Sequence, residues 1–427
     1  MRLESRNEQA QFRGDVTKPH ELLSRQTPDS LSEMQAQTSI EVTIERLLPG
    51  GVGLAHAEGR TLFVALAAPG DIVRVRIDQI RGKLGFASIE EIVTPSPVRV
   101  EPPCPYFGRC GGCDFQQLSY AAQLDAKIEI IRDCLHRIAR LEDLPEIAIM
   151  PSPQQWHYRA RANWQYDSRT NALGYFERGS HRVCDVAECA VLVPELQQTL
   201  RDLRQHARDR SLREDLRDID ALAGDEVVSV APPLTDWPTR NVSRRAGAES
   251  YELDAAAFFQ TNHFLLAPLI DEAVKDAGGE TAVDLYCGVG LFTVPLARRC
   301  ANVTGIEANA TASKFARRNL RSAQLANAQV ITSRAGDWLK THALSSGPID
   351  FLLLDPPRSG VESGAIEDIL AIKPRRISYV SCDPATLARD LKALVAAAYS
   401  LDSVAAFDMF PQTHHVETVV HLRGPTS

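Results

Sequence analysis

The chain has 427 residues, of which 44% are hydrophobic and 24% are charged. These values are ordinary for a soluble globular protein, and the length predicts two or three domains. No run of about 18 apolar residues is present, which excludes a membrane-spanning helix. The N-terminus lacks the apolar core of a signal peptide, so we expect a cytoplasmic protein without a membrane partner.

Cysteine content and net charge further limit the kinds of protein that this sequence fits. Nine cysteines, an odd number at irregular spacing, argue against a disulfide framework and favour metal ligands or catalytic groups. The formal net charge of −8 weakly opposes a nucleic-acid partner, because phosphate binding relies on Lys and Arg. A local basic face with stacking aromatics is still predicted between residues 156 and 182, and an ordinary strand face over an aromatic core is the alternative. The side chains concerned are Trp156, Tyr158, Arg159, Arg161, Trp164, Tyr166, Arg169, Tyr175, Phe176, Arg178, His181 and Arg182.

Two different segments open the chain. Residues 1–38 are rich in Gln, Ser, Glu and Arg, and we expect them to be disordered. From residue 39 onward, short apolar segments separated by Gly and Pro turns indicate a small β-barrel. The expected strands cover residues 41–47, 53–55, 61–64 and 72–77. This segment resembles a TRAM domain, a small OB-like barrel found on RNA-modifying enzymes.

A cluster of cysteines follows the barrel. Three of them lie within ten residues, at Cys104, Cys110 and Cys113. Clustered thiolates select zinc or an iron–sulfur cluster, and spacing alone does not separate the two. A fourth ligand must come from elsewhere, and the candidates are Cys134, Cys184 and Cys189. Cys134 is expected to pack within an amphipathic helix at residues 122–140, and of the other two we favour Cys189.

The rest of the chain divides into a segment typical of an antiparallel sheet and a segment in which strands and helices alternate. Residues 154–254 are typical of an antiparallel sheet, and residues 201–217 predict a charged, exposed helix. After residue 256, strands and helices alternate, which predicts a mainly parallel sheet with crossover helices. The expected strands are 282–285, 303–307, 349–355, 377–381 and 416–422, and the expected helices are 264–277, 291–298 and 310–323.

A glycine turn in this last segment indicates a nucleoside cofactor. Asp284-x-x-x-Gly288-x-Gly290 follows a strand and precedes a helix, and Glu307 ends the next strand, where a carboxylate can bind ribose hydroxyls. The third glycine position of a dinucleotide fingerprint is Thr293. We therefore favour S-adenosylmethionine (SAM) over NAD and over a structural turn.

Two further strand ends carry candidate chemistry. Asp355-Pro356-Pro357-Arg358 has Arg where enzymes that methylate nucleobase amino groups have an aromatic, which disfavours that reaction; a rigid proline turn is the alternative. Cys382 ends an apolar strand, beyond which ligands bind in open α/β sheets, and we interpret it as a nucleophile. A buried structural cysteine is the alternative.

Such a thiolate has a specific use in uracil chemistry. Its addition to C6 of the ring makes C5 nucleophilic enough to accept a methyl group from SAM. The C5 proton must then leave, which requires a general base. Glu417 is the candidate, because burial in the last strand raises a carboxyl pKa, and a salt-bridged surface carboxylate is the alternative. His414 and His415 are further candidates, although structural histidines are the favoured interpretation.

In combination, these motifs resemble the RNA 5-methyluridine methyltransferases, specifically the iron–sulfur branch that modifies bacterial 23S ribosomal RNA. The resemblance covers residues 39–422 and rests on the barrel, the cysteine cluster and the segments 258–262, 284–290, 355–358, 381–390 and 411–417. It implies an α/β fold with an OB-like TRAM barrel (39–98), a central α+β iron–sulfur domain (99–255) and a C-terminal Rossmann-like SAM-dependent methyltransferase domain (256–427).

The resemblance also implies roles for individual residues. It implies Cys382 as nucleophile and Glu417 as proton acceptor, with the target base flipped into the pocket. The implied SAM contacts are Gln260, Tyr286, Glu307 and Asp355. The implied ligands of a [4Fe–4S] cluster are Cys104, Cys110, Cys113 and Cys189. The expected partner is 23S ribosomal RNA, before or during ribosome assembly, and a monomer is the default.

The sequence differs from the family pattern at some positions, and it is also compatible with other functions. Asp383 replaces the Asn of many members, and a carboxylate beside the thiol is expected to raise its pKa. Leu291 replaces an Asn near the cofactor, and residues 1–38 match nothing in the family. The competing functions are the same chemistry on transfer RNA and a non-catalytic, RNA-binding or redox-sensing iron–sulfur protein.

Overall fold

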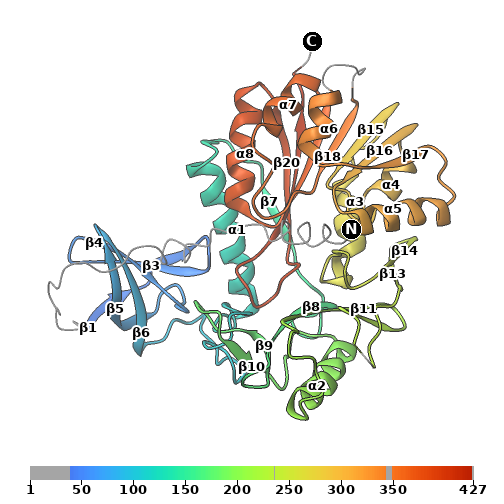
Figure 1. Ribbon diagram of the computed structural model, residues 1–427. Helices are drawn as coiled ribbons and strands as arrows, with labels where there is room; N and C mark the ends of the chain where they lie inside the picture. Colours follow the sequence, from blue (N-terminus) through green and yellow to red (C-terminus); the bar gives the residue numbers. More distant parts are fainter. Residues whose placement is uncertain (1–38, 235, 343–348, 426–427) are drawn as a thin grey trace, which may run out of the picture.

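The computed structural model describes residues 39–234, 236–342 and 349–425 (Figure 1). The segment expected to be disordered, residues 1–38, lies outside these described residues. An N-terminal sheet, a central sheet with a hairpin, and a large C-terminal sheet follow one another along the chain. Among the described residues, no helix has both the length and the apolar character needed to cross a membrane.

The N-terminal sheet has six strands that wrap one apolar core, which confirms the predicted small barrel. Its strand order is β1-β5-β6-β4-β3-β2. Gly53 is required inside it, because a Cβ there would lie 2.8 Å from Cβ of Ala67. The last long strand was not predicted. The strands are β1 (Ser39–Thr43), β2 (Arg46–Leu48), β3 (Val52–Ala57), β4 (Arg60–Val64), β5 (Ile72–Arg81) and β6 (Leu84–Thr94).

The central sheet is antiparallel, as predicted, with the order β10-β9-β8-β11-β12, and the hairpin β13–β14 follows it. The helix predicted at residues 201–217 is wrong in position, because α2 spans Pro194–Arg208. Pro194 suits the first helical turn, and Leu196, Leu200 and Leu203 bury one face on the sheet. The strands are β8 (Arg161–Asp167), β9 (Ala172–Phe176), β10 (Val183–Asp185), β11 (Asp218–Ala223), β12 (Val228–Ala231), β13 (Val242–Ala246) and β14 (Glu249–Leu253).

The C-terminal sheet has eight strands in the order β17-β16-β15-β18-β19-β21-β20-β7. The five strands from β17 to β19 are parallel, as predicted, whereas β21 runs antiparallel to both of its neighbours. Three of its members, β7, β17 and β20, were not predicted. The strands are β7 (Ile147–Met150), β15 (Thr281–Leu285), β16 (Asn302–Glu307), β17 (Ala328–Thr332), β18 (Phe351–Leu354), β19 (Arg376–Ser381), β20 (Ser400–Phe407) and β21 (Glu417–Arg423).

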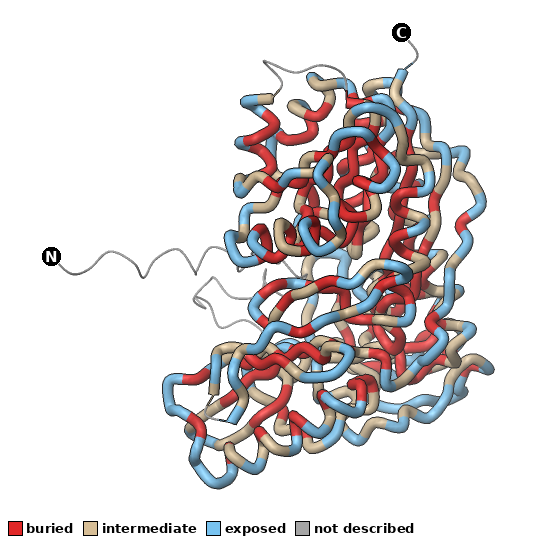
Figure 2. Tube along the Cα trace, turned by 90° about the vertical axis from the view of Figure 1, so that its right-hand side faces the viewer, coloured by how far each residue is buried: buried red, intermediate tan, exposed pale blue. Residues whose placement is uncertain are grey.

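Helices cover both faces of this sheet, and the buried segments run through its interior (Figure 2). Successive strand residues alternate between the two layers: Leu352 and Leu354 contact one, Phe351 and Leu353 the other. One layer contains α1 (Tyr120–Arg137), α6 (Ala335–His342), α7 (Ala365–Ile372) and α8 (Pro384–Ala396). The other contains α3 (Leu266–Ala273), preceded by the short η2 (His263–Leu265), with α4 (Thr293–Ala297) and α5 (Ala310–Ser322). Helix α1 and strand β7, from the segment expected to form the central domain, thus pack with the C-terminal sheet.

Candidate active site and cysteine pocket

The register of two antiparallel strands brings Cys382 and Glu417 together. Cys382 follows the last residue of β19, and Glu417 is the first residue of β21. Ser381 pairs with Thr418, so Cys382 and Glu417 form the next facing pair at the end of the ladder. Glu417 is only 2% exposed. The two residues are 35 positions apart in the chain, and strand pairing alone makes them neighbours.

The electrostatic surroundings of the thiol are mixed. Burial raises the pKa of Cys382 to about 12, and the negative charges of Glu417 and Asp355 act in the same direction. The guanidinium of Arg358 opposes them and lowers this pKa. Arg358 is exposed to solvent, at the turn that follows β18. The thiol therefore needs a nearby cation to become a useful thiolate at neutral pH.

Three carboxyl groups lie at one end of the sheet: Glu307 ends β16, Asp355 follows β18, and Glu417 begins the antiparallel strand β21. Burial raises the pKa of Glu417 well above its ordinary value, and the charge of Asp355 raises it further. Burial and the charge of Glu307 raise the pKa of Asp355 to about 7. Burial also raises the pKa of Glu307, although backbone N–H groups act against this. Buried carboxyl groups whose pKa values are raised in this way favour a cationic ligand, which would stabilise their charged forms.

The glycine turn is built around Glu307. The backbone N–H groups of Gly288 and Asn309 donate to its two carboxylate oxygens, at 2.9 and 2.7 Å. Gly288 and Gly290 have φ angles of +55° and +90°, in the left-handed region that favours glycine. Thr293, which replaces the third glycine, donates its hydroxyl proton to buried Asp284 at 2.6 Å. The turn therefore holds a carboxylate with lone pairs left for a ligand.

The other two predicted cofactor contacts, Tyr286 and Gln260, are buried or partly buried polar side chains. The hydroxyl of Tyr286 is buried and has no hydrogen-bond partner among the described residues, as is also true of Oδ1 of Asp284. Gln260 is 5% exposed, and no hydrogen bond within the described part of the chain engages its side chain. Unpartnered buried polar groups are costly unless a ligand satisfies them. These residues therefore fit a bound polar molecule.

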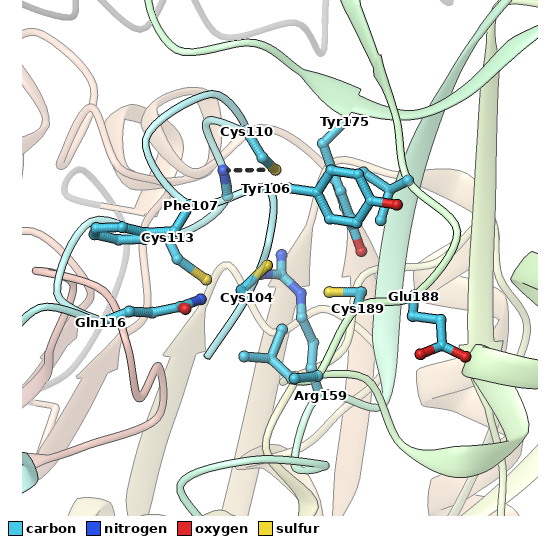
Figure 3. Close-up of a pocket in the computed structure, with 14 residues that line it drawn as sticks. Cys104, Tyr106, Phe107, Cys110, Cys113, Gln116, Arg159, Tyr175, Glu188 and Cys189 are labelled. Atoms are coloured by element: carbon cyan, nitrogen blue, oxygen red, sulfur yellow. Dashed lines mark hydrogen bonds between the residues drawn. The ribbon is translucent and has the colours of Figure 1, made fainter. Parts of the chain in front are cut away.

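A second site is a pocket whose lining includes the predicted cysteine set: Cys104, Cys110, Cys113 and Cys189. Their sulfur atoms surround the same hollow (Figure 3). The backbone N–H of Gly112 donates to Sγ of Cys110 at 3.4 Å. Among the described residues, no group of three or more His, Cys, Asp or Glu side chains is placed to hold a metal ion.

The alternative fourth ligands do not line this pocket. Cys134 lies on the buried face of α1 and packs in the core, as predicted. Cys184 is buried in β10, beside Arg109. Arg159 does line the pocket, and no carboxylate of the described residues forms an ion pair with it. A guanidinium without a carboxylate partner, beside four thiols, favours a negatively charged occupant.

Two sequence expectations need correction. The carboxylate of Asp383 accepts hydrogen bonds from the backbone N–H groups of Ala385 and Thr386, at 3.0 and 2.8 Å, and so caps α8. The negative charges with the largest effect on the pKa of the thiol are those of Glu417 and Asp355. The predicted stacking face is also wrong for most of its aromatics, because they form core. Tyr158, Trp164 and Tyr166 are at most 3% exposed, and Tyr175 lines the cysteine pocket.

Comparisons with known proteins identify families that this chain resembles. Residues 239–424 match the family model described as tRNA (uracil-5-)-methyltransferase. Residues 40–98 match the TRAM domain of tRNA (uracil(54)-C(5))-methyltransferase. The solved tRNA (uracil-54, C5)-methyltransferase of Pyrococcus abyssi, in complex with S-adenosyl-L-homocysteine, is similar with a TM-score of 0.70 and 26% identity. The match covers 90% of this chain and all of that one.

Two relatives match this chain over nearly their full length. The 23S rRNA (uracil(1939)-C(5))-methyltransferase of Pectobacterium atrosepticum is 31% identical over 89% of this chain and 93% of its own length. An uncharacterized RNA methyltransferase of Halalkalibacterium halodurans is 30% identical over 92% of this chain and 99% of its own. The chain therefore belongs to the family of RNA uracil-5-methyltransferases and carries an N-terminal TRAM domain.

Proposed function

We propose that this protein methylates C5 of a uridine in 23S ribosomal RNA with SAM as methyl donor, through a covalent bond between Cys382 and the base. The observation that carries the proposal is the strand register that sets Cys382 beside Glu417. The named relative that acts on 23S rRNA supports the choice of RNA. The archaeal structural neighbour acts on transfer RNA, which keeps transfer RNA as the competing substrate.

The residues around the glycine turn fit SAM. Its sulfonium and ammonium groups are cations, which suit the buried carboxyl groups of Glu307, Asp355 and Glu417. Glu307 is placed to accept hydrogen bonds from the ribose hydroxyls. Tyr286 and Gln260 offer polar groups that lack partners among the described residues. When bound, SAM supplies the methyl group that C5 acquires.

The chemistry of the base then follows from two side chains. The thiolate of Cys382 bonds to C6, and the electron pair of the C5–C6 double bond moves into an enolate. C5 would use that pair to bond to the methyl carbon, while the bond between that carbon and the sulfonium sulfur of SAM would break and leave its electron pair on a neutral thioether. Glu417 next removes the C5 proton, and the returning electron pair expels the Cys382 thiolate and restores the ring double bond. Arg358 favours the thiolate at the start and at the end of this cycle.

We further propose that Cys104, Cys110, Cys113 and Cys189 hold a [4Fe–4S] cluster. A single zinc ion would need its thiolate sulfurs about 3.8 Å apart, from bonds of about 2.3 Å at tetrahedral angles. No such group is placed for one metal ion in the described part of the chain. In a cubane each thiolate binds a different iron, so the thiolates are spread more widely around the cluster. The unpaired guanidinium of Arg159 suits the net negative charge of a thiolate-ligated cluster.

The decisive experiment measures 5-methyluridine in RNA after reaction with purified enzyme and SAM. Free 23S rRNA, assembled large subunits and transfer RNA are compared in one assay, so that RNA class and assembly stage are read together. Cys382→Ala should abolish methylation while SAM binding stays within about two-fold. RNA bearing 5-fluorouridine should trap wild-type protein as a covalent adduct, because its C5 carries no removable proton. Full activity of Cys382→Ala would refute the covalent mechanism.

A further inference from the structure

The loop that leads into Glu417 is held by the segment that carries the predicted cluster ligands. Asp114 directly follows Cys113, and its carboxylate accepts a hydrogen bond from the backbone N–H of His414 at 2.8 Å. Its second oxygen contacts Nδ1 of the same histidine at 2.5 Å. The backbone N–H groups of Asp114 and Phe115 both donate to the carbonyl oxygen of Gln412, at 3.1 and 3.0 Å. Four hydrogen bonds thus join segments 300 residues apart.

A side chain of α1 secures the same loop from another direction. The backbone N–H of Gln412 donates to Oε1 of Gln123 at 2.9 Å, and Nε2 of Gln123 donates to Oε1 of Gln412 at 3.0 Å. Both glutamines are buried. Gln412 has a φ of +69°, a conformation that side chains other than glycine rarely adopt. Tertiary hydrogen bonds therefore select the path of this loop, since local preference opposes it.

The barrel closes over the same junction. Gly51, in the turn between β2 and β3, has a φ of +73°. It lies close to Asp114 and His414. A Cβ at this position would lie 3.0 Å from Cβ of His414 and 3.3 Å from Oδ2 of Asp114. The side chains of Asp114 and His414 are only 15% and 24% exposed, so the hydrogen bond between them is largely shielded from water. The TRAM domain, the cysteine segment and the active-site loop meet at this pair.

Glu417 depends on this loop for its position. Among the described residues, no hydrogen-bond donor contacts its carboxylate, so its backbone sets where the side chain lies. That backbone enters β21 directly from the loop. We propose that Asp114 is a positioning residue for Glu417, fixing the loop through His414 and Gln412 so that the carboxylate faces C5 of the base. The inference rests on the proposed function, in which Glu417 removes the C5 proton after methyl transfer.

This order of steps gives a signature that general loss of stability does not produce. If Glu417 is misplaced, thiolate addition and methyl transfer still occur, but release of the RNA is delayed. Asp114→Ala should therefore accumulate a methylated protein–RNA adduct that survives denaturing electrophoresis, on ordinary RNA without fluorine. The kcat should fall by about ten-fold to a hundred-fold, the cost expected for a displaced catalytic group. The KM for SAM should stay within about two-fold of the wild-type value.

A second variant and a matched control complete the test. Gln123→Leu removes the other support of Gln412 without touching the cysteine segment, and it should accumulate the same adduct. Asp133→Ala is the control, because it breaks the ion pair of 3.0 Å between α1 and Arg46 of the barrel, away from the loop. Iron content is measured for every variant, so that cluster loss is separated from loop displacement.

The results that would overturn this inference differ from those that would overturn the proposed function. Wild-type turnover in both Asp114→Ala and Gln123→Leu would overturn the inference, as would reduced turnover without an adduct in either variant. An equal adduct in Asp133→Ala would also overturn it, because the effect would then belong to the barrel contact in general. If wild-type protein neither methylates RNA nor is trapped by 5-fluorouridine, the proposed function itself fails, independently of Asp114.

Discussion

Replacing Arg358 with Gln tests the electrostatic account of Cys382, the proposed nucleophile. Arg358 lowers the pKa of the Cys382 thiol against the opposing effects of burial and of two carboxylates. An opposite charge within about 4–6 Å commonly moves a pKa by about 1–3. Because Arg358 is exposed and screened by water, we take the lower end, about 1. At a fixed pH below the pKa, the thiolate fraction of Arg358→Gln should then be about ten-fold smaller.

The assay is alkylation of Cys382 by iodoacetamide in protein without RNA, followed by mass spectrometry of the Cys382 peptide. Only the thiolate reacts at a useful rate, so the rate reports the thiolate fraction. With a pKa of about 12 for the wild-type thiol, the rate should rise about ten-fold per pH unit between pH 7 and 10. The curve of Arg358→Gln should have the same slope and lie about one pH unit to the alkaline side.

Arg376→Gln provides the matched control, because Arg376 lies at the opposite end of β19 and pairs with Asp276. Its alkylation curve should coincide with that of wild type. An unchanged curve for Arg358→Gln would refute the reasoning, since the cation would then not act on the thiol. A displacement to acid pH would refute it as well. A uniform fall in methylation of RNA, without any change in alkylation, would assign Arg358 to RNA binding.

Three further predictions follow from the same structure. Glu417→Gln should form the methylated RNA adduct but fail to release it, and denaturing electrophoresis should show the complex; rapid release would exclude Glu417 as the base. Glu307→Ala should weaken SAM binding about 10- to 100-fold in calorimetry, the cost of losing hydrogen bonds to a charged group, and unchanged affinity would contradict its role. Cys189→Ser should lose iron and the broad visible absorption of anaerobically purified protein, whereas Cys184→Ser should keep both; the reverse result would exchange the ligand.

Much of the fold was predictable because short stretches of adjacent residues indicate its turns and strand ends. The Gly-rich turns of the barrel, the glycine turn after β15 and the Asp-Pro stop after Cys382 each depend on a few adjacent residues. The error at α2 has a local cause too: charged residues extend past Arg208, while the buried leucines that define the helix begin at Leu196. Predicting strand β20 was harder, because five of its eight residues are not buried and its pattern is weak.

For the candidate sites too, some features follow from local sequence and others depend on the tertiary structure. Sequence alone determined which side chains are candidates for reactive chemistry, since a thiol, a carboxylate or a cysteine cluster is recognised by residue type and neighbouring sequence. Only the tertiary structure decided which of them meet. The antiparallel insertion of β21 next to β19 sets Glu417 beside Cys382, and the approach of Asp114 to His414 joins segments 300 residues apart. Such contacts depend on strand order and packing across the whole chain, and no local periodicity encodes them.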